Sequence, residues 1–186
     1  MHCNALFQHL HSLIRQLKHV ELLVVLPHIT QAHQLAPDHL PLGPAHLFAE
    51  LVKQGTRTVA FVRSRKLAEL VCLYAQDGLR RTHRDLAERI SPYRASYLPE
   101  DRRRIERALF EGKLVGVVAT TALELGIDVG DLDATIISGY PGTISSTWQQ
   151  AGRSGRRGEE SLAVLAARDN PLDQYLMRHP ATFFGR

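Results

Sequence analysis

Three arginines alternate with glycines in the stretch WQQAGRSGRRG, residues 148–158. The glycines follow a GxxGxxG spacing near the end of the chain, unlike the GxGxxG loop of a dinucleotide-binding fold. A diffuse basic patch for nucleic acid is a second interpretation, although it needs no regularly spaced glycines. The third interpretation places Arg153 and Arg156 at i, i+3 on one helix face, where two guanidinium groups suit a phosphoryl group that gains charge in a transition state. The spacing favours this third interpretation and leaves Arg157 as a solvated charge.

The segment VRSRKLAE carries polar groups that suit a phosphate. It follows an apolar run and brings Ser64 and Arg65 to the start of a predicted helix, whose free N–H groups favour an anion. A capping serine beside solvated arginines explains the same residues equally well. The sequence leaves both alternatives open here.

A second segment, VVATTALELGIDVGDLD, joins hydroxyl groups to an aspartate. Its apolar run ends in Thr120 and Thr121, and Gly126 then permits a tight turn before Asp128. Asp128 is placed to accept hydrogen bonds from sugar hydroxyls, or it forms a turn like the aspartates after it. By itself this segment only suggests a nucleotide.

Apolar strands alternate with helices from residue 44 onward. The predicted helices are 44–55, 64–76, 82–90, 99–112 and 170–179, and the predicted strands are 57–62, 114–120, 133–138 and 161–167, with 93–98 extended. Strands that are apolar throughout predict an α/β fold, with a mostly parallel sheet covered by helices on both faces. In such sheets the functional groups follow the carboxyl ends of the strands, as RSR does after VAFV, TTALELGID after VGVVA and GYPGTISS after ATIIS.

Residues 1–43 read differently and predict an N-terminal helical extension and linker. Leucines and an isoleucine at helical spacing between residues 6 and 17 indicate an amphipathic helix, and ELLVVL is a strand or a helix end. Eight of the ten histidines lie before residue 50, but without metal-ligand spacing. We therefore expect scattered surface histidines and no metal site.

Composition indicates a soluble, cytoplasmic protein of one domain. The chain has 186 residues with a net charge of +4, and its basic residues are 19 Arg and 4 Lys, a weak sign of a phosphate-rich partner. A genome rich in G and C would give the same bias. Two cysteines make a disulfide framework improbable, and the apolar run LLVVL is too short to span a membrane.

Taken together and in order, these segments resemble the second RecA-like lobe of superfamily 2 helicases over residues 44–186. FVRSR resembles motif IV, LPEDRRRIERALFEGK the helix before motif V, VVATTALELGIDVGDLD motif V and QQAGRSGR motif VI. In detail, the residues of these motifs are similar to those of the mitomycin-repair-factor (YprA-like) helicases and their fungal Hrq relatives. The resemblance implies a RecA-like three-layer sandwich and a helicase C-terminal domain.

The resemblance also implies a nucleotide face. Arg153 and Arg156 match the two motif VI arginines that reach the γ-phosphate across the interlobe cleft, with Arg156 as the main finger. Gly126 and Asp128 match motif V residues that face the nucleotide, with Asp128 near the ribose. Gln149 matches the first residue of motif VI, which links the nucleotide and nucleic-acid sites.

A second face is implied for nucleic acid. Ser64, Arg65 and Thr120 match positions that hold the nucleic-acid backbone, and Thr121 and Arg103 are further candidates. The implied partner is single-stranded or duplex nucleic acid, taken to be DNA, with 3′→5′ movement. A non-catalytic nucleic-acid-binding lobe is the alternative function.

The sequence contains no GxxxxGK[ST] loop and no acidic pair placed to hold Mg²⁺. If Arg153 and Arg156 are arginine fingers, ATP and its Mg²⁺ must be held mainly by a first RecA-like lobe in cis, outside this chain. The cysteine-rich zinc-binding domain that follows in this subgroup is also expected outside it. We therefore expect no ATPase activity from the chain alone.

Overall fold

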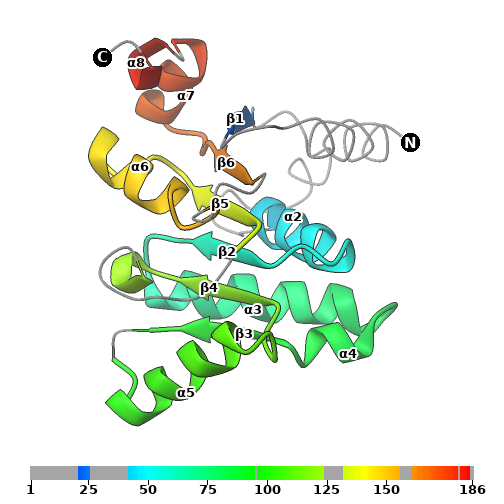
Figure 1. Cartoon of the computed structure of the whole chain (residues 1–186). Coiled ribbons are helices and arrows are strands. Elements are labelled where there is room, and N and C mark those ends of the chain that lie inside the picture. The colour runs from blue at the N-terminus through cyan, green and yellow to red at the C-terminus, as the bar shows by residue number, and fades with distance from the viewer. Residues whose placement is uncertain are drawn as a thin grey trace.

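Six strands form one sheet in the order β1-β6-β5-β2-β4-β3, and every neighbouring pair is parallel (Figure 1). The structure is a computed structural model that describes residues 21–25, 42–94, 96–123, 132–155, 161–179 and 181–184. The strands are β1 Glu21–Val25, β2 Thr58–Phe61, β3 Ile90–Tyr93, β4 Gly116–Ala119, β5 Ala134–Ser138 and β6 Leu162–Ala166. The helices are α2 Leu42–Lys53, α3 Arg65–Arg80, α4 Arg84–Ala87, α5 Pro99–Phe110, α6 Ile144–Ala151, α7 Pro171–Arg178 and α8 Ala181–Phe184, with a 3-10 helix η3 at Thr121–Leu123.

The strands lie between two layers of helices, which confirms the predicted α/β three-layer fold (Figure 1). Alternate residues of a strand point to opposite faces, so β2 sends Ala60 to one core and Val59 to another. The first core contains α2, α3 and α4, the second contains α5, and a third contains α6 and α7. Burial on both faces explains why these strands are apolar throughout.

Two predicted boundaries are wrong between residues 82 and 98. The predicted helix 82–90 is only one turn, α4, because Ile90 is already paired with Gly116 in β3. The extended stretch predicted over 93–98 contributes only Tyr93 to that strand, and Tyr97 N–H donates to Arg94 O in a turn. Since β3 is the edge strand, Pro92 does not interrupt a ladder on both sides.

Within the apolar segment ELLVVL, predicted as a strand or a helix end, Glu21–Val25 forms the strand β1. It pairs with β6 from Glu21↔Leu162 to Val25↔Ala166. Part of the stretch before residue 44 therefore lies in the same sheet as the strands after it. The division of the chain at residue 43 stays a prediction.

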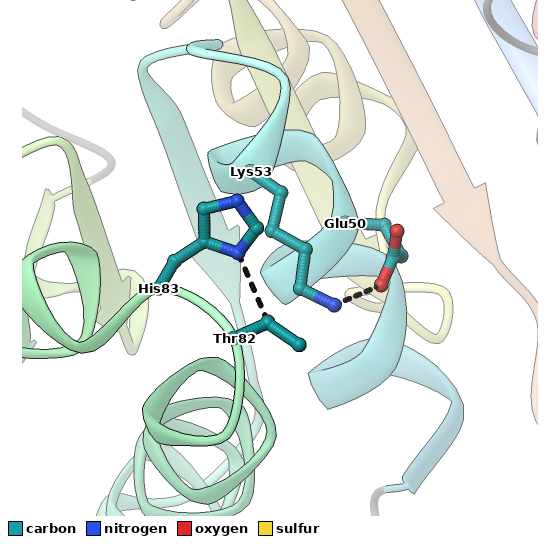
Figure 2. A network of polar contacts seen from close by, with 4 residues as sticks. All are labelled: Glu50, Lys53, Thr82 and His83. Carbon is teal, nitrogen blue, oxygen red and sulfur yellow. Dashed lines mark hydrogen bonds and ion pairs between the residues drawn. The ribbon is translucent and has the colours of Figure 1, made fainter.

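Two polar contacts near the ends of α2 and α3 are local pairs. Lys53 Nζ lies 2.6 Å from Glu50 Oε1 near the end of α2, and His83 Nδ1 lies 2.9 Å from Thr82 Oγ1 beyond α3 (Figure 2). Each pair joins residues no more than three positions apart, and pairs of this kind contribute about 0–1 kcal/mol. They stabilise helix ends and bring no distant segments together.

Gly116 is required by close packing, which gives a first prediction. A Cβ on Gly116 would lie 2.6 Å from Cζ of the fully buried Phe48. Gly116→Ala should therefore lower the free energy of unfolding by about 1–3 kcal/mol in urea denaturation. The matched control is Gly78→Ala in α3, where a Cβ meets nothing within 4 Å, and it should stabilise by about 0.5–1 kcal/mol. Equal stability of the two variants would contradict the packing of Phe48 on β4.

Two further observations concern the Cys72 thiol and the length of the helices. Burial raises the pKa of the Cys72 thiol to about 12, so this cysteine stays protonated and is a poor nucleophile. No helix within the described ranges is both long and apolar enough to cross a membrane.

Candidate functional site

Because all strands are parallel, their carboxyl ends lie at one edge of the sheet and bring together the predicted segments that follow β2 and β4. β2 pairs with both β4 and β5, so the loops that follow these three strands are neighbours. Val62 N–H donates to Ala119 O at 2.8 Å, which extends the pairing just beyond β2. Ser64 and Thr120 therefore leave the sheet from adjacent strands.

Ser64 begins α3 as the sequence predicts. Its Oγ accepts a hydrogen bond from Leu67 N–H at 3.2 Å, and its backbone is extended, with φ −137°. The capping alternative is thus confirmed, while a phosphate contact stays a prediction. Ser64 and Arg65 are both exposed, so both side chains are accessible to a ligand.

Thr120 and Thr121 lie where β4 passes into η3. Leu123 N–H donates to Thr120 O at 3.3 Å, closing the 3-10 turn. Thr121 is exposed and Thr120 is half-buried. Arg103 is also exposed, on the second turn of α5, the helix that follows β3.

Gln149 lies on α6, which follows β5. Thr143 Oγ1 caps this helix by accepting from Ser146 N–H at 3.0 Å. Gln149 is exposed, whereas its neighbour Gln150 is buried against the domain. The helix therefore presents Gln149 at the surface, one turn before the arginines.

The prediction that Arg153 and Arg156 share one helix face is wrong. α6 ends at Ala151, and Gly152 N–H donates back to Trp148 O at 2.8 Å. Gly155 has φ +74°, a left-handed conformation that breaks helical geometry before residue 156, and its N–H donates to Leu132 O at 3.1 Å. The glycines thus end a helix and hold a turn against the start of β5, instead of spacing residues along a helix.

Ser154 anchors this turn and was missed by sequence reasoning. It is 2% exposed, and its Oγ donates to Ala151 O at 3.2 Å while accepting from Thr135 Oγ1 at 3.3 Å. Arg153, beside it, is half-buried, and its Nε donates to Gln149 O at 3.4 Å. The turn is therefore tied to β5 through a buried hydroxyl pair. Gly126, Asp128, Arg156 and Arg157 lie outside the described residues.

A second cluster, also absent from the predictions, holds the turn Ser138–Tyr140 at the end of β5. Arg168 Nη2 donates to Ser138 O at 2.8 Å, and Arg63 Nη2 donates to Tyr140 O at 2.8 Å. Asp173 Oδ2 accepts from Tyr140 N–H at 3.3 Å and from Arg168 N–H at 2.8 Å. We call Arg63, Tyr140, Arg168 and Asp173 the β5 clamp.

Within the β5 clamp Tyr140 and Asp173 are buried, Arg168 is half-buried and Arg63 is exposed. Asp173 is 1% exposed, and a Cβ on Gly139 would lie 2.7 Å from Arg168 Nε, so the guanidinium fills the space above that glycine. Burial lowers the pKa of Arg168, the nearby charge of Arg63 lowers it further, and Asp173 opposes both effects. Two cations thus approach the same turn, with one buried carboxylate beside them.

No spacing in the sequence signals this cluster. Arg63 lies 77 residues from Tyr140, and Arg168 lies 30 residues from Ser138. Asp173 reads as an ordinary acid in the first turn of a capped helix, and Asn170 Oδ1 does accept from its N–H at 2.9 Å. Only the topology of the sheet brings these groups together.

Comparison with known proteins agrees with this geometry. The family model described as helicase conserved C-terminal domain matches residues 44–158. The chain is 46% identical over 140 residues to the uncharacterized ATP-dependent helicase YprA of Bacillus subtilis, covering 75% of this chain and 18% of that protein. It is 38% identical over 160 residues to the ATP-dependent helicase HRQ1 of Saccharomyces cerevisiae, covering 86% of this chain and 15% of that protein.

Solved structures show the same arrangement. The DUF1998 helicase MrfA bound to DNA and AMPPNP aligns with a TM-score of 0.72 at 45% identity, over 76% of this chain and 20% of that one. The Mycobacterium smegmatis helicase Lhr bound to ssDNA and AMP-PNP aligns with a TM-score of 0.67 at 27% identity, over 87% of this chain and 22% of that one. The fold is therefore that of a RecA-like helicase C-terminal lobe, and this chain spans only a small part of each relative's length. The chain belongs to the helicase C-terminal domain family of superfamily 2 ATP-dependent helicases, among relatives of YprA, Hrq1 and MrfA.

Proposed function

We propose that this chain is the second motor lobe of a two-lobed, ATP-dependent helicase that moves 3′→5′ along DNA. The observation that carries the proposal is that the motif IV segment and the start of the motif V segment leave the carboxyl ends of two adjacent strands, β2 and β4, of one parallel sheet. Relatives named ATP-dependent helicases, and neighbours solved with DNA and AMPPNP, support both the nucleotide and the nucleic acid. The 3′→5′ direction rests on the family resemblance.

In this proposal the lobe completes a nucleotide site that the first lobe holds. ATP and its Mg²⁺ bind the first lobe in cis, and Arg156 donates to the γ-phosphate as charge develops, with Arg153 beside it. Gly126 and Asp128 approach the ribose, and Gln149 lies between the nucleotide and the nucleic acid. Arg153 follows the end of α6 in a turn that Ser154 anchors. The backbone of Arg153 is therefore held in place by this turn.

Residues that follow the strands bind the nucleic-acid backbone, and we call Ser64, Arg65, Arg103, Thr120 and Thr121 the grip. Arg65 and Arg103 are exposed and carry the charge, while Ser64, Thr120 and Thr121 supply hydroxyls for phosphate oxygens. ATP binding closes the lobes, and hydrolysis reopens them, so that the grip advances along the strand. Backbone contacts of this kind bind without regard to base sequence.

The isolated chain provides the first test. With ATP, Mg²⁺ and single-stranded DNA it should release no phosphate above a buffer blank, because the groups that hold ATP belong to the other lobe. The complete two-lobed protein is the positive control, and DNA should stimulate its hydrolysis. Robust turnover by the chain alone would contradict the division of the site. DNA binding without DNA-stimulated hydrolysis in the complete protein would favour the non-catalytic lobe.

Salt dependence tests the nucleic-acid grip. Each phosphate contact to a single strand contributes about −0.7 to the slope of log K against log salt concentration. Replacing both Arg65 and Arg103 with alanine in the isolated chain should therefore make that slope shallower by about 1.4. Arg81→Ala serves as a control, since this exposed arginine lies beyond α3 and pairs with Asp77 at 3.1 Å. An unchanged slope in the double variant would remove these arginines from the grip.

A further inference from the structure

We propose that Arg63 is a positioning residue that couples the nucleic-acid grip after β2 to the turn that leads into α6 and the motif VI arginines. The inference rests on the proposed function, because it assigns how two parts of that motor lobe communicate. It gives a role to Arg63, a residue of the FVRSR segment to which the resemblance assigns no ligand.

The backbone of Arg63 adjoins the grip without being part of it. Its backbone directly precedes Ser64, the cap of α3, and directly follows Val62, whose N–H is bonded to Ala119 O at 2.8 Å. Arg63 therefore lies where the loops after β2 and β4 leave the sheet together. A displacement of Ser64 and Arg65 by a bound strand is transmitted to the Arg63 backbone through the chain itself.

The other end of Arg63 holds the turn before α6. Its Nη2 donates to Tyr140 O at 2.8 Å, and Tyr140 is followed by Pro141, Gly142 and the helix cap Thr143. On the far side, Gly139 N–H donates to Ala166 O at 2.8 Å and Asp173 accepts from Tyr140 N–H. The turn is thus fixed to β6 and α7 on one side and linked by Arg63 to the end of β2 on the other.

The charge of Arg63 is unfavourable for a purely structural contact. Arg168 approaches the same turn through Ser138 O, and the two positive charges repel, which contributes to the lowered pKa of Arg168. A neutral donor would hold Tyr140 O without this repulsion. Local arrangements that cost energy are concentrated at functional positions, and here the costly group joins the two functional loops.

The test compares Arg63→Met with Arg63→Lys in the complete protein. Methionine keeps a long side chain but cannot donate a hydrogen bond, whereas lysine can still donate to Tyr140 O. In Arg63→Met, DNA-stimulated ATP hydrolysis should fall about tenfold in kcat, the loss expected for one hydrogen bond from a charged donor. The KM for ATP, the DNA-free rate and the Kd for single-stranded DNA should each stay within about twofold. Arg63→Lys should recover most of the stimulation.

Other outcomes would overturn the inference. Equal loss of the DNA-free and DNA-stimulated rates would show that Arg63 acts on hydrolysis itself. A large rise in the Kd for DNA would place it in the grip. Unchanged DNA stimulation of ATP hydrolysis in Arg63→Met would show that Arg63 has no coupling role. A fall in the thermal unfolding midpoint of this variant by more than about 4 °C would show that its role is structural. A wild-type protein without DNA-stimulated hydrolysis would contradict the proposed function itself, and this inference with it.

Discussion

Arg156→Ala should lower the kcat of DNA-stimulated ATP hydrolysis by about a thousandfold in the complete two-lobed protein, because arginine fingers contribute about 10³–10⁵ to phosphoryl transfer. The guanidinium stabilises charge that develops on the γ-phosphate oxygens only in the transition state, so ATP binding should change far less than kcat. Steady-state hydrolysis at saturating DNA, with the Kd for DNA measured alongside, checks both parts of the prediction.

Arg157→Ala is the matched control, since it removes the same charge one residue away. Arg157 falls outside the motif VI match, and its loss should alter kcat by less than about threefold. Intact hydrolysis in Arg156→Ala, together with weaker DNA binding in both variants, would instead support a diffuse basic patch. That comparison separates the two interpretations that the glycine-arginine stretch left open.

Asp173→Ala should lower the free energy of unfolding of the chain by about 3 kcal/mol. The carboxylate is 1% exposed and accepts from two backbone N–H groups, and hydrogen bonds to charged groups contribute about 1.5–3 kcal/mol each. We take the lower end of that range because the second oxygen, Oδ1, is buried and accepts from no described group. Urea unfolding at neutral pH measures the loss.

Asp169→Ala supplies the control for charge and position. Asp169 lies in the loop just before α7 and is exposed, so its removal should change stability by less than about 0.5 kcal/mol. Asp173→Asn should fall between the two, because an amide oxygen can still accept from Tyr140 and Arg168. A stability loss in Asp169→Ala as large as that in Asp173→Ala would contradict the β5 clamp as the element that holds this end of the sheet.

Local chemistry was sufficient to predict most helices and strands. Ser64 and Asn170 cap α3 and α7 through their side chains, and Pro99 opens α5, as the sequence indicates. The errors arose where a distant partner decided the structure. Ile90 leaves a helical pattern because it pairs with Gly116 on β4.

The site was predictable only where a motif carries it. The motifs shared with the family predicted a nucleic-acid contact at Ser64, Arg65 and Thr120. The loops that carry these residues follow adjacent strands of the sheet. The geometry around the arginines was not predictable, because the i, i+3 spacing of Arg153 and Arg156 implied a helix that Gly155 ends with φ +74°. The β5 clamp joins groups that follow β2, β5 and β6 with one group from α7, and no linear pattern can reveal such contacts.

The central claim is that this lobe supplies arginines to ATP held by its partner lobe. It is tested most directly by a crystal structure of the complete protein with AMPPNP and single-stranded DNA. We predict a guanidinium nitrogen of Arg156 within about 2.7–3.2 Å of a γ-phosphate oxygen, with Ser64 or Thr120 at a DNA phosphate. Arg153 and Arg156 both lying on DNA phosphates, with the γ-phosphate contacted by the first lobe alone, would contradict the claim.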